Sequence, residues 1–214
     1  MKYKTIFFDL DGTITDSAPG IMNSIKYALE KNHLPMLSEE QLRSFIGPPL
    51  RGQFCKVCGL ADEESARMVE DYREYYRDKG IFGNNVYDGV IEMLEKLRKK
   101  GFRLAIATSK PEKYAKIIID HFHLTKYFAC VAGMEMDGGR GTKAQVITYA
   151  LEKNDITDKS KVLMIGDREH DVIGAHENGL DCLGILYGFG SRKEFEEAGA
   201  DYIRENVEDI LQFV

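Results

Sequence analysis

The hydrophobic residues of this chain follow two alternating periods. Continuous apolar runs rich in β-branched and aromatic residues are typical of strands covered on both faces, and they occur at residues 3–10, 102–109 and 161–167. Residues 128–133 and 181–188 are shorter strand candidates, and residues 200–206 are a candidate for a last, short strand. Apolar residues at helical spacing lie between most of these runs, at residues 89–101, 112–122, 142–154, 171–179 and 191–199. Strands that alternate with helices predict an α/β fold with a parallel sheet.

One long segment interrupts this alternation. From Ala18 to about Asn84 we find no strand-like run, and four helical patterns follow one another at residues 20–32, 38–47, 49–59 and 62–80. The last of them is charged except for one apolar stripe, as in a helix that covers a small core. The sequence therefore predicts two domains, a core of residues 1–16 and 84–214 and an inserted four-helix domain of residues 17–83.

Composition indicates a globular protein without a polyanionic partner. A chain of 214 residues suits one main core with an insertion. Its hydrophobic content of 43% and charged content of 30% are those of a folded domain. The net charge is −6, and lysine and arginine do not gather in one stretch. We therefore expect neither nucleic acid nor an anionic membrane as the main partner.

Membrane and redox signals point to a cytoplasmic protein. No apolar run approaches the roughly 20 residues of a membrane span, and the first residues enter a strand without a signal-peptide pattern. The four cysteines fit a reduced compartment. Cys55 and Cys58 have the spacing of half a zinc motif, but a second pair is missing from the sequence. We expect these two cysteines to act as small hydrophobic residues on one helix turn.

Polar residues that are candidates for ligand binding or catalysis follow the predicted strands. Asp9 and Asp11 end the first strand in "TIFFDLDGTITDS", where bare carboxylates are costly unless a cation or a reaction needs them. Ligands of open parallel sheets bind at the carboxyl ends of the strands. The other polar residues that follow strands or open the next helix are Thr108, Ser109, Lys110, Lys143, Asp167 and Asp171.

This residue set favours a hard cation and a phosphate. Four carboxylates with few nitrogen or sulfur ligands favour Mg²⁺ over Zn²⁺. Thr108, Lys143 and free loop amides after Asp9 suit phosphate oxygens. A carboxylate nucleophile is able to form an aspartyl-phosphate. Residues 9 and 11 share a face in an extended chain, so one attacks while the other serves the leaving oxygen.

Four short motifs resemble those of the haloacid dehalogenase-like hydrolase superfamily, in the same order and over nearly the whole chain. They are "DLDGT" (9–13), "AIATS" (105–109), Lys143 and "GDREHD" (166–171). The helical insertion after the first motif resembles the cap of the phosphoglycolate phosphatase and β-phosphoglucomutase-like branch. The resemblance implies a Rossmann-like three-layer sandwich with a helical cap that closes over the site and excludes water.

The resemblance also implies roles for individual residues. Asp9 would be the nucleophile, Asp11 the general acid and then the base, and Lys143 the cation that neutralises Asp9 and the phosphate. Mg²⁺ would be held by Asp9, the backbone carbonyl of Asp11 and Asp167, with Asp171 orienting this shell. The phosphate would contact Gly12, Thr13, Thr108, Ser109 and Lys143.

For three basic residues, the sequence allows either a functional or a solvated role. Arg51, after the Gly-Pro-Pro turn of "FIGPPLRGQF", either meets the polar tail of a substrate or is a solvated helix residue. Arg43 is expected to be solvated. Lys110 is either a second cation near the site or a surface residue.

These expectations converge on a Mg²⁺-dependent phosphoric monoester hydrolase. The substrate would be a small phosphorylated metabolite, either a phosphoglycolate-like acid or a nucleoside 5′-monophosphate, and the enzyme a monomer or weak homodimer. The alternative is a phosphomutase of the β-phosphoglucomutase type that uses the same Asp9 and Asp11; "DGT" instead of "DGV" favours the phosphatase by family analogy. The full acidic set disfavours a non-catalytic binding protein, and it also disfavours a dehalogenase.

Overall fold

The chain divides into two compact units. The computed structural model describes residues 2–136 and 139–214. The first unit, called the core unit here, combines the residues up to Asp16 with Val86–Val214, and the second, the helical unit, is Ser17–Asn85. The chain therefore leaves the core unit once and returns to it.

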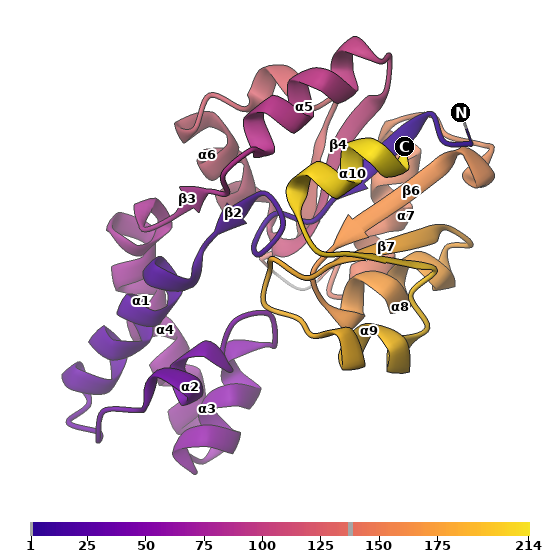
Figure 1. The fold of residues 1–214 in the computed structure, drawn as a ribbon. Coiled ribbons are helices and arrows are strands. Elements are labelled where there is room, and N and C mark those ends of the chain that lie inside the picture. The colour runs from indigo at the N-terminus through magenta and orange to yellow at the C-terminus, as the bar shows by residue number, and fades with distance from the viewer. Residues whose placement is uncertain (1, 137–138) are drawn as a thin grey trace. The chain divides into compact units, whose positions relative to one another are not determined.

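A parallel sheet forms the centre of the core unit (Figure 1). Within the described residues its six strands are arranged in the order β5-β4-β1-β6-β7-β8, and every pairing is parallel. Strand β1 pairs with β4 along one edge and with β6 along the other, so it is a central strand, and its unbroken apolar run is that of a sheet covered by helices on both faces. The strands are β1 Thr5–Phe8, β4 Arg103–Pro111, β5 Val131–Met134, β6 Val162–Gly166, β7 Asp181–Ile185 and β8 Tyr202–Arg204.

Helices cover both faces of this sheet, as the α/β prediction requires. On one face α5 packs against α10, and on the other α7 lies beside α8, and α8 beside α9 (Figure 1). The contact between the sheet and helices α7, α8 and α9 is apolar. There Phe7 and Met164 of the sheet pack with Val146, Val172 and Phe195 of the helices. The helices are α5 Val90–Lys99, α6 Glu112–His121, α7 Lys143–Lys153, α8 Glu169–Glu177, α9 Arg192–Ala198 and α10 Val207–Phe213, and the 3₁₀ turns are Thr125–Tyr127 and Lys159–Lys161.

The strand order changes direction next to β1. The chain runs outward from β1 to β4 and β5, and then returns to β6 on the other side of β1. Loops that leave β1 and β6 therefore diverge to opposite faces, and such a switch point is where open α/β sheets bind ligands. The predicted site residues of the first and fourth motifs lie at the ends of these two strands.

Some elements begin or end differently from the sequence prediction. Helix α8 begins at Glu169, two residues before the predicted start, because Asp171 accepts a hydrogen bond from the backbone N–H of Arg168 at 3.1 Å and so caps the helix there. The sequence pattern missed α10. It also missed a two-stranded sheet of β2 Thr15–Asp16 and β3 Asn85–Val86.

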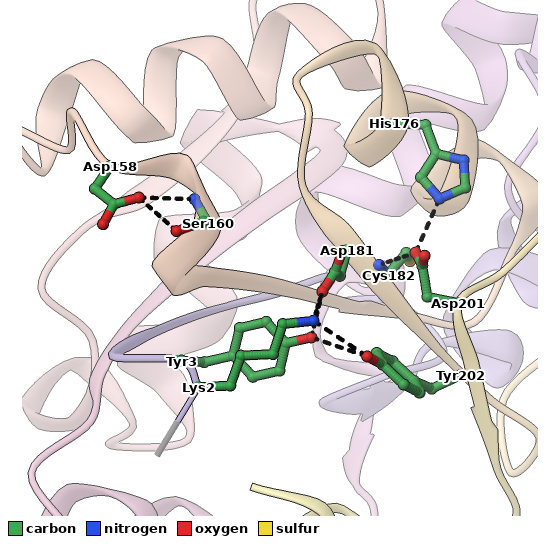
Figure 2. Close-up of polar contacts among 9 residues, drawn as sticks. All are labelled: Lys2, Tyr3, Asp158, Ser160, His176, Asp181, Cys182, Asp201 and Tyr202. Atoms are coloured by element: carbon green, nitrogen blue, oxygen red, sulfur yellow. Dashed lines mark hydrogen bonds and ion pairs between the residues drawn. The ribbon is translucent and has the colours of Figure 1, made fainter.

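The amino ends of the strands are tied together by polar side chains (Figure 2). Lys2 donates to Asp181, the first residue of β7, and to the hydroxyl of Tyr202 on β8 at 3.2 Å. The hydroxyl of Tyr3 also donates to Asp181. These contacts fix the start of the chain against β7 and β8 at the sheet edge opposite the strand ends that carry the predicted motifs.

The helical unit consists of two long helices, two short ones and a 3₁₀ turn at Gly80–Phe82. In the pair of long helices, Lys31 lies 2.7 Å from Asp71, and the rings of Tyr27 and Tyr75 are 5.2 Å apart. Its α-helices are α1 Ala18–Lys31, α2 Glu39–Arg43, α3 Leu50–Cys58 and α4 Asp62–Asp78. That this unit acts as a cap stays a prediction.

The two cysteines of the half zinc motif lie on α3 of the helical unit. Cys55 and Cys58 are half-buried free thiols, and the sulfur of Cys55 lies 3.1 Å from the hydroxyl of Ser65. Such contacts fit the packing role that the sequence suggested. Across the described residues, we find no helix with the length and apolar character needed to cross a membrane.

Candidate active site

Three aspartates form a buried acidic cluster at the carboxyl ends of β1 and β6. Asp9 follows β1, Asp167 follows β6, and Asp171 lies in the first turn of α8. All three are buried, and one carboxylate oxygen from each lies within 4.8 Å of the other two. The backbone N–H of Asp9 donates to the carbonyl of Ile165 at 2.9 Å, which fixes the two strand ends relative to each other. The predicted site residues of two distant motifs are thus brought together.

Lys143 is the cation of this cluster. It is the first residue of α7, whose start is capped by Thr142 through a hydrogen bond from the N–H of Gln145 at 3.2 Å. Its buried ammonium nitrogen lies 3.0 Å from Oδ1 of Asp9 and 2.6 Å from Oδ1 of Asp171. Burial lowers the pKa of Lys143, but the charges of Asp171 and Asp9 outweigh burial and raise it above its ordinary value. The lysine therefore stays charged.

One lysine does not neutralise three carboxylates. Burial, followed by the charges of Asp171 and Asp9, raises the pKa of Asp167 well above its ordinary value. The pKa of Asp171 rises to about 6 because burial and the charge of Asp9 outweigh the opposite effect of Lys143. These raised pKa values indicate that the three carboxylates carry more negative charge than Lys143 neutralises. Three buried carboxylates with unrelieved charge are the donor set that a hard divalent cation requires, so the residues fit Mg²⁺.

The loop after β1 corrects two details of the sequence argument. The strand ends at Phe8, and the chain then bends at Leu10, whose carbonyl accepts from the N–H groups of Thr13, Ile14 and Thr15. The argument that residues 9 and 11 share a face of an extended chain therefore does not apply. The expectation of free loop amides is wrong for Leu10, Gly12 and Thr13, because their N–H groups donate to Asp9, Thr15 and Leu10, respectively.

Gly12 and Thr13 support Asp167. Gly12 has a φ of +82°, and a Cβ added there would lie only 2.1 Å from Oδ2 of Asp167. The hydroxyl of Thr13 donates to Oδ1 of Asp167 at 3.3 Å. Glycine is thus required both by the backbone conformation and by the close approach of the loop. The direct phosphate contacts predicted for these two residues stay predictions.

Asp11 pairs with a different lysine. Its carboxylate is not part of the acidic cluster defined above, and its Oδ2 lies 2.6 Å from Nζ of Lys110. The Lys110 side chain is 6% exposed. Of the two interpretations left open for Lys110, the surface residue is therefore excluded.

The end of β4 carries the second motif. Thr108 is buried, and its hydroxyl accepts from the N–H of Lys110 at 3.2 Å, whereas Ser109 is half-buried. The register between β4 and β5 shifts between Thr108 and Pro111, so the strand is irregular where the motif ends. These positions are compatible with the predicted phosphate contacts of Thr108 and Ser109, which stay predictions.

A loop that the sequence analysis missed completes the surroundings of Asp167. After β7, the N–H of Phe189 donates to Oδ2 of Asp167 at 2.9 Å, and the hydroxyl of Tyr187 donates to the carbonyl of Thr13 at 2.9 Å. A Cβ on Gly190 would lie 2.0 Å from the Asp167 carbonyl. The available signal was the repeated glycine in "YGFG" after a predicted strand, since glycine marks close backbone approach.

Arg43 and Arg51, the two arginines of the helical unit that the sequence analysis considered, have partners within that unit. Arg51 lies on α3, and its guanidinium Nε donates to Oδ1 of Asp62 at 2.6 Å. Its side chain is 54% exposed. Arg43 pairs with Glu39 on the surface of α2 at 3.0 Å, in agreement with the solvated role expected for it. The substrate contact of Arg51 stays a prediction.

A family comparison decides the classification of the chain. The model of the haloacid dehalogenase-like hydrolases matches residues 6–185. The chain belongs to this family. The match contains the predicted motifs, from Asp9 to Asp171, and therefore the whole acidic cluster and Lys143.

Individual relatives of this hydrolase agree with the predicted branch. A 5′-nucleotidase of Pseudomonas aeruginosa is 40% identical over 91% of this chain and 87% of its own length. A phosphoglycolate phosphatase of Vibrio parahaemolyticus is 28% identical over 99% of this chain and 96% of its own length. The tyrosine-protein kinase PtkA of Mycobacterium tuberculosis is 37% identical over 86% of this chain, which spans 62% of that protein.

A solved structure agrees with the fold. The crystal structure of a predicted phosphatase from Clostridium acetobutylicum has a TM-score of 0.92 and 43% identity, covering 100% of this chain and 98% of its own. These similarities confirm the phosphoglycolate phosphatase-like branch, the Rossmann-like α/β fold and the enzyme class of phosphoric monoester hydrolases. They leave the roles of the individual site residues as predictions.

Proposed function

We propose that this hydrolase is a Mg²⁺-dependent phosphatase that cleaves a small phosphomonoester through an aspartyl-phosphate on Asp9. The observation that carries the proposal is the buried cluster of Asp9, Asp167 and Asp171 with Lys143 among them. In a hydrolase of this family, the cluster would bring together a nucleophile, a fixed cation and a set of oxygen donors. These are the parts that phosphoryl transfer needs, because its catalysis depends mainly on positioning and charge stabilisation.

In the first step, a carboxylate oxygen of Asp9 attacks the phosphorus atom. The bond between phosphorus and the ester oxygen breaks, and Asp11 donates a proton to that oxygen, so that a neutral alcohol leaves. Lys143 is held against Oδ1 of Asp9 and offsets negative charge as the phosphoryl group arrives. Leu10 and Lys143 both contact Oδ1 of the Asp9 carboxylate, so we assign the attack to Oδ2.

In the second step, water attacks the phosphorus atom of the aspartyl-phosphate. Asp11, now ionised, accepts a proton from the water, and the bond between phosphorus and Asp9 breaks. Inorganic phosphate leaves and the Asp9 carboxylate is restored. The same carboxyl group thus serves as acid and then as base, and its protonation state is reset in each cycle.

Asp9, Asp167 and the backbone carbonyl of Asp11 would hold the metal, with Asp171 orienting this shell. When bound, Mg²⁺ supplies positive charge to the phosphoryl oxygens and to the excess carboxylates. Thr13 and Phe189 hold Asp167 in place through hydrogen bonds to its two oxygens. Such outer contacts orient ligating groups in metal sites.

The substrate class follows from the relatives named above. Nucleoside 5′-monophosphates are the first candidates, because the 5′-nucleotidase of Pseudomonas aeruginosa is 40% identical to this chain. Small phosphorylated acids such as phosphoglycolate are the second. The proposal keeps the cytoplasmic location and the monomeric or weakly dimeric state that the sequence suggested.

The test is a screen of phosphate release with nucleoside 5′-monophosphates, phosphoglycolate, sugar phosphates and phosphotyrosine. Each substrate is assayed with Mg²⁺, with EDTA, and with EDTA followed by excess Mg²⁺. The proposal predicts release from at least one metabolite that stops with EDTA and returns with Mg²⁺. Release that is unaffected by the chelator, or no release from any phosphomonoester, contradicts the proposal.

The phosphomutase alternative is tested in the same preparation. A mutase of the β-phosphoglucomutase type would convert a sugar 1-phosphate into the 6-phosphate isomer without free phosphate, using the same Asp9 and Asp11. Incubation with β-glucose 1-phosphate, a trace of the bisphosphate and Mg²⁺ separates the two activities. The phosphatase proposal expects free phosphate or no reaction, and formation of the isomer would replace it with the mutase.

A further inference from the structure

Lys110 is a buried cation that lies outside the four sequence motifs described above. It belongs to the last residues of β4, and its ammonium reaches the loop after β1, where it lies 2.6 Å from Oδ2 of Asp11. Its side chain is only 6% exposed, and that of Asp11 is 19% exposed. Removing a lysine from water is costly, so it is retained where its charge has a defined task.

The backbone around Lys110 is held firmly. Its N–H donates to the hydroxyl of Thr108 at 3.2 Å, in the segment where the register between β4 and β5 shifts. On β5, a Cβ added to Gly133 would lie 2.6 Å from the carbonyl oxygen of Lys110. The neighbouring strand therefore packs directly against this residue. Lys110 is thus presented to Asp11 from a rigid strand end and not from a mobile loop.

The two carboxylate oxygens of Asp11 have different surroundings. Oδ2 accepts from Lys110, whereas Oδ1 is buried and has no hydrogen-bond partner among the described residues. A buried acceptor without a partner is unfavourable, and such groups are retained where a substrate or a reaction completes them. One oxygen of Asp11 is therefore fixed, and the other keeps an unused acceptor position.

We propose that Lys110 is a positioning residue that holds Oδ2 of Asp11 and thereby presents Oδ1 to the leaving oxygen of the substrate. The inference rests on the proposed function, since it assigns the atom of Asp11 that transfers the proton. The two lysines of the site then have separate tasks. Lys143 serves Asp9 and Asp171, and Lys110 serves Asp11.

The test uses the leaving-group dependence of kcat/KM. Wild type, Lys110→Met and Lys110→Arg are compared on dinitrophenyl phosphate, p-nitrophenyl phosphate and an alkyl phosphate. A dinitrophenolate needs no proton to leave, whereas an alkoxide does. If Lys110 positions the acid, Lys110→Met loses little on dinitrophenyl phosphate and about 10²-fold or more on the alkyl phosphate, within the usual range of general acid catalysis. Lys110→Arg restores part of the difference, because it keeps a cationic donor.

The matched control is Lys116→Met. Lys116 lies six residues further along the chain on α6, is exposed and pairs with Glu112. This substitution is expected to leave all three rates unchanged. Thermal unfolding of each variant checks that the fold is intact, and if Lys110→Met does not fold, Lys110→Gln and Lys110→Arg give the same comparison.

The outcomes separate the inference from the proposed function. Equal losses on all three substrates would mean that Lys110 binds phosphate or only supports the fold, and they contradict the positioning role. A steeper dependence on the leaving group in Lys110→Met, with partial recovery in Lys110→Arg, supports it. If wild type shows no Mg²⁺-dependent release from these substrates or from any phosphomonoester of the screen above, the proposed function fails first, independently of Lys110.

Discussion

The ammonium nitrogen of Lys143 lies 2.6 Å from Oδ1 of Asp171, although both side chains are almost completely buried. The two residues come from α7 and α8, and these helices approach closely because α8 carries Gly174 at their contact. A Cβ at Gly174 would lie 2.9 Å from Cγ of Lys143. The pair thus depends on a small residue in the neighbouring helix, and it connects the two helices that begin near the acidic cluster.

Asp171 gives the metal-free protein a distinctive dependence of stability on pH. Its pKa is about 6 in the folded protein, mainly through burial, and near 4 in an unfolded chain. The folded state therefore holds the proton more tightly, so this contribution is fully present below about pH 4 and is lost as the pH rises through about 6. Wild type should therefore lose stability relative to Asp171→Asn over this interval.

Urea unfolding in EDTA at several pH values between these limits measures the effect. Asp171→Asn is the control, because the amide does not titrate while all other groups are retained. Saturating Mg²⁺ should abolish the difference, since a cation favours the ionised carboxylate. A constant difference in unfolding free energy between the two proteins at every pH in EDTA would contradict the assignment.

Gly12→Ala should damage the site, whereas Gly101→Ala should only strain the backbone. Both glycines have positive φ values, +82° and +89°, so alanine at either position costs about 1–2 kcal/mol of conformational energy. The added Cβ at Gly12 would meet Asp167 at 2.1 Å, but the Cβ at Gly101 would meet nothing within 4 Å.

Two measurements separate strain from damage in these glycine variants. Urea unfolding should show a similar loss of stability from backbone strain in both, with a further loss in Gly12→Ala from the displaced carboxylate. Phosphate release should fall strongly in Gly12→Ala and remain near wild type in Gly101→Ala. Equal activity in the two variants would show that the close approach of Gly12 to Asp167 is unimportant.

Tyr187→Phe tests the loop that the sequence analysis missed. The hydroxyl of the partly buried Tyr187 donates to the carbonyl of Thr13, and its loss leaves that carbonyl without this donor. The expected loss of unfolding free energy is about 1–3 kcal/mol, together with reduced kcat. Tyr27→Phe is the control, because its hydroxyl bonds to Glu74 at the surface. Equal effects of the two substitutions on both quantities would contradict a role for Tyr187 in the site.

Arg51→Ala separates a structural contact from a substrate contact. The pair with Asp62 is exposed to solvent, so the stability of the variant should change little. If Arg51 meets the tail of the substrate, kcat/KM falls more for the preferred metabolite than for p-nitrophenyl phosphate. Arg43→Ala, which removes the surface pair with Glu39, is the matched control. Equal losses on both substrates would leave Arg51 with its Asp62 contact alone.

The sequence was sufficient to predict the α/β sheet and the polar residues that lie at the carboxyl ends of β1 and β6. Strand β1 is recognisable because an unbroken apolar run ends in Asp9 and Asp11, and the same pattern precedes Asp167. Hydrophobic periodicity and the position of charges relative to strand ends are local properties, so they are visible in a linear chain. The positions of Asp9, Asp11 and Asp167 after β1 and β6 were therefore predicted from these local patterns.

Other features depend on contacts between distant segments. The pairing of Lys110 with Asp11 joins residues that are 99 positions apart, and that of Tyr187 with Thr13 joins residues 174 apart. Helix α10 was missed because its seven residues are too few for a clear helical period. The bend at Leu10 is set by hydrogen bonds of the loop, and the apolar pattern of the strand does not encode it.

The most direct test of the central claim is phosphate release by Asp9→Asn in the presence of Mg²⁺. The amide is a poor nucleophile, so the account predicts turnover at the level of the uncatalysed background, with an unfolding midpoint close to that of wild type. Asp120→Asn, the same substitution at an exposed position of α6, serves as the control and should retain full activity. Appreciable Mg²⁺-dependent phosphate release by folded Asp9→Asn would contradict the claim that Asp9 accepts the phosphoryl group.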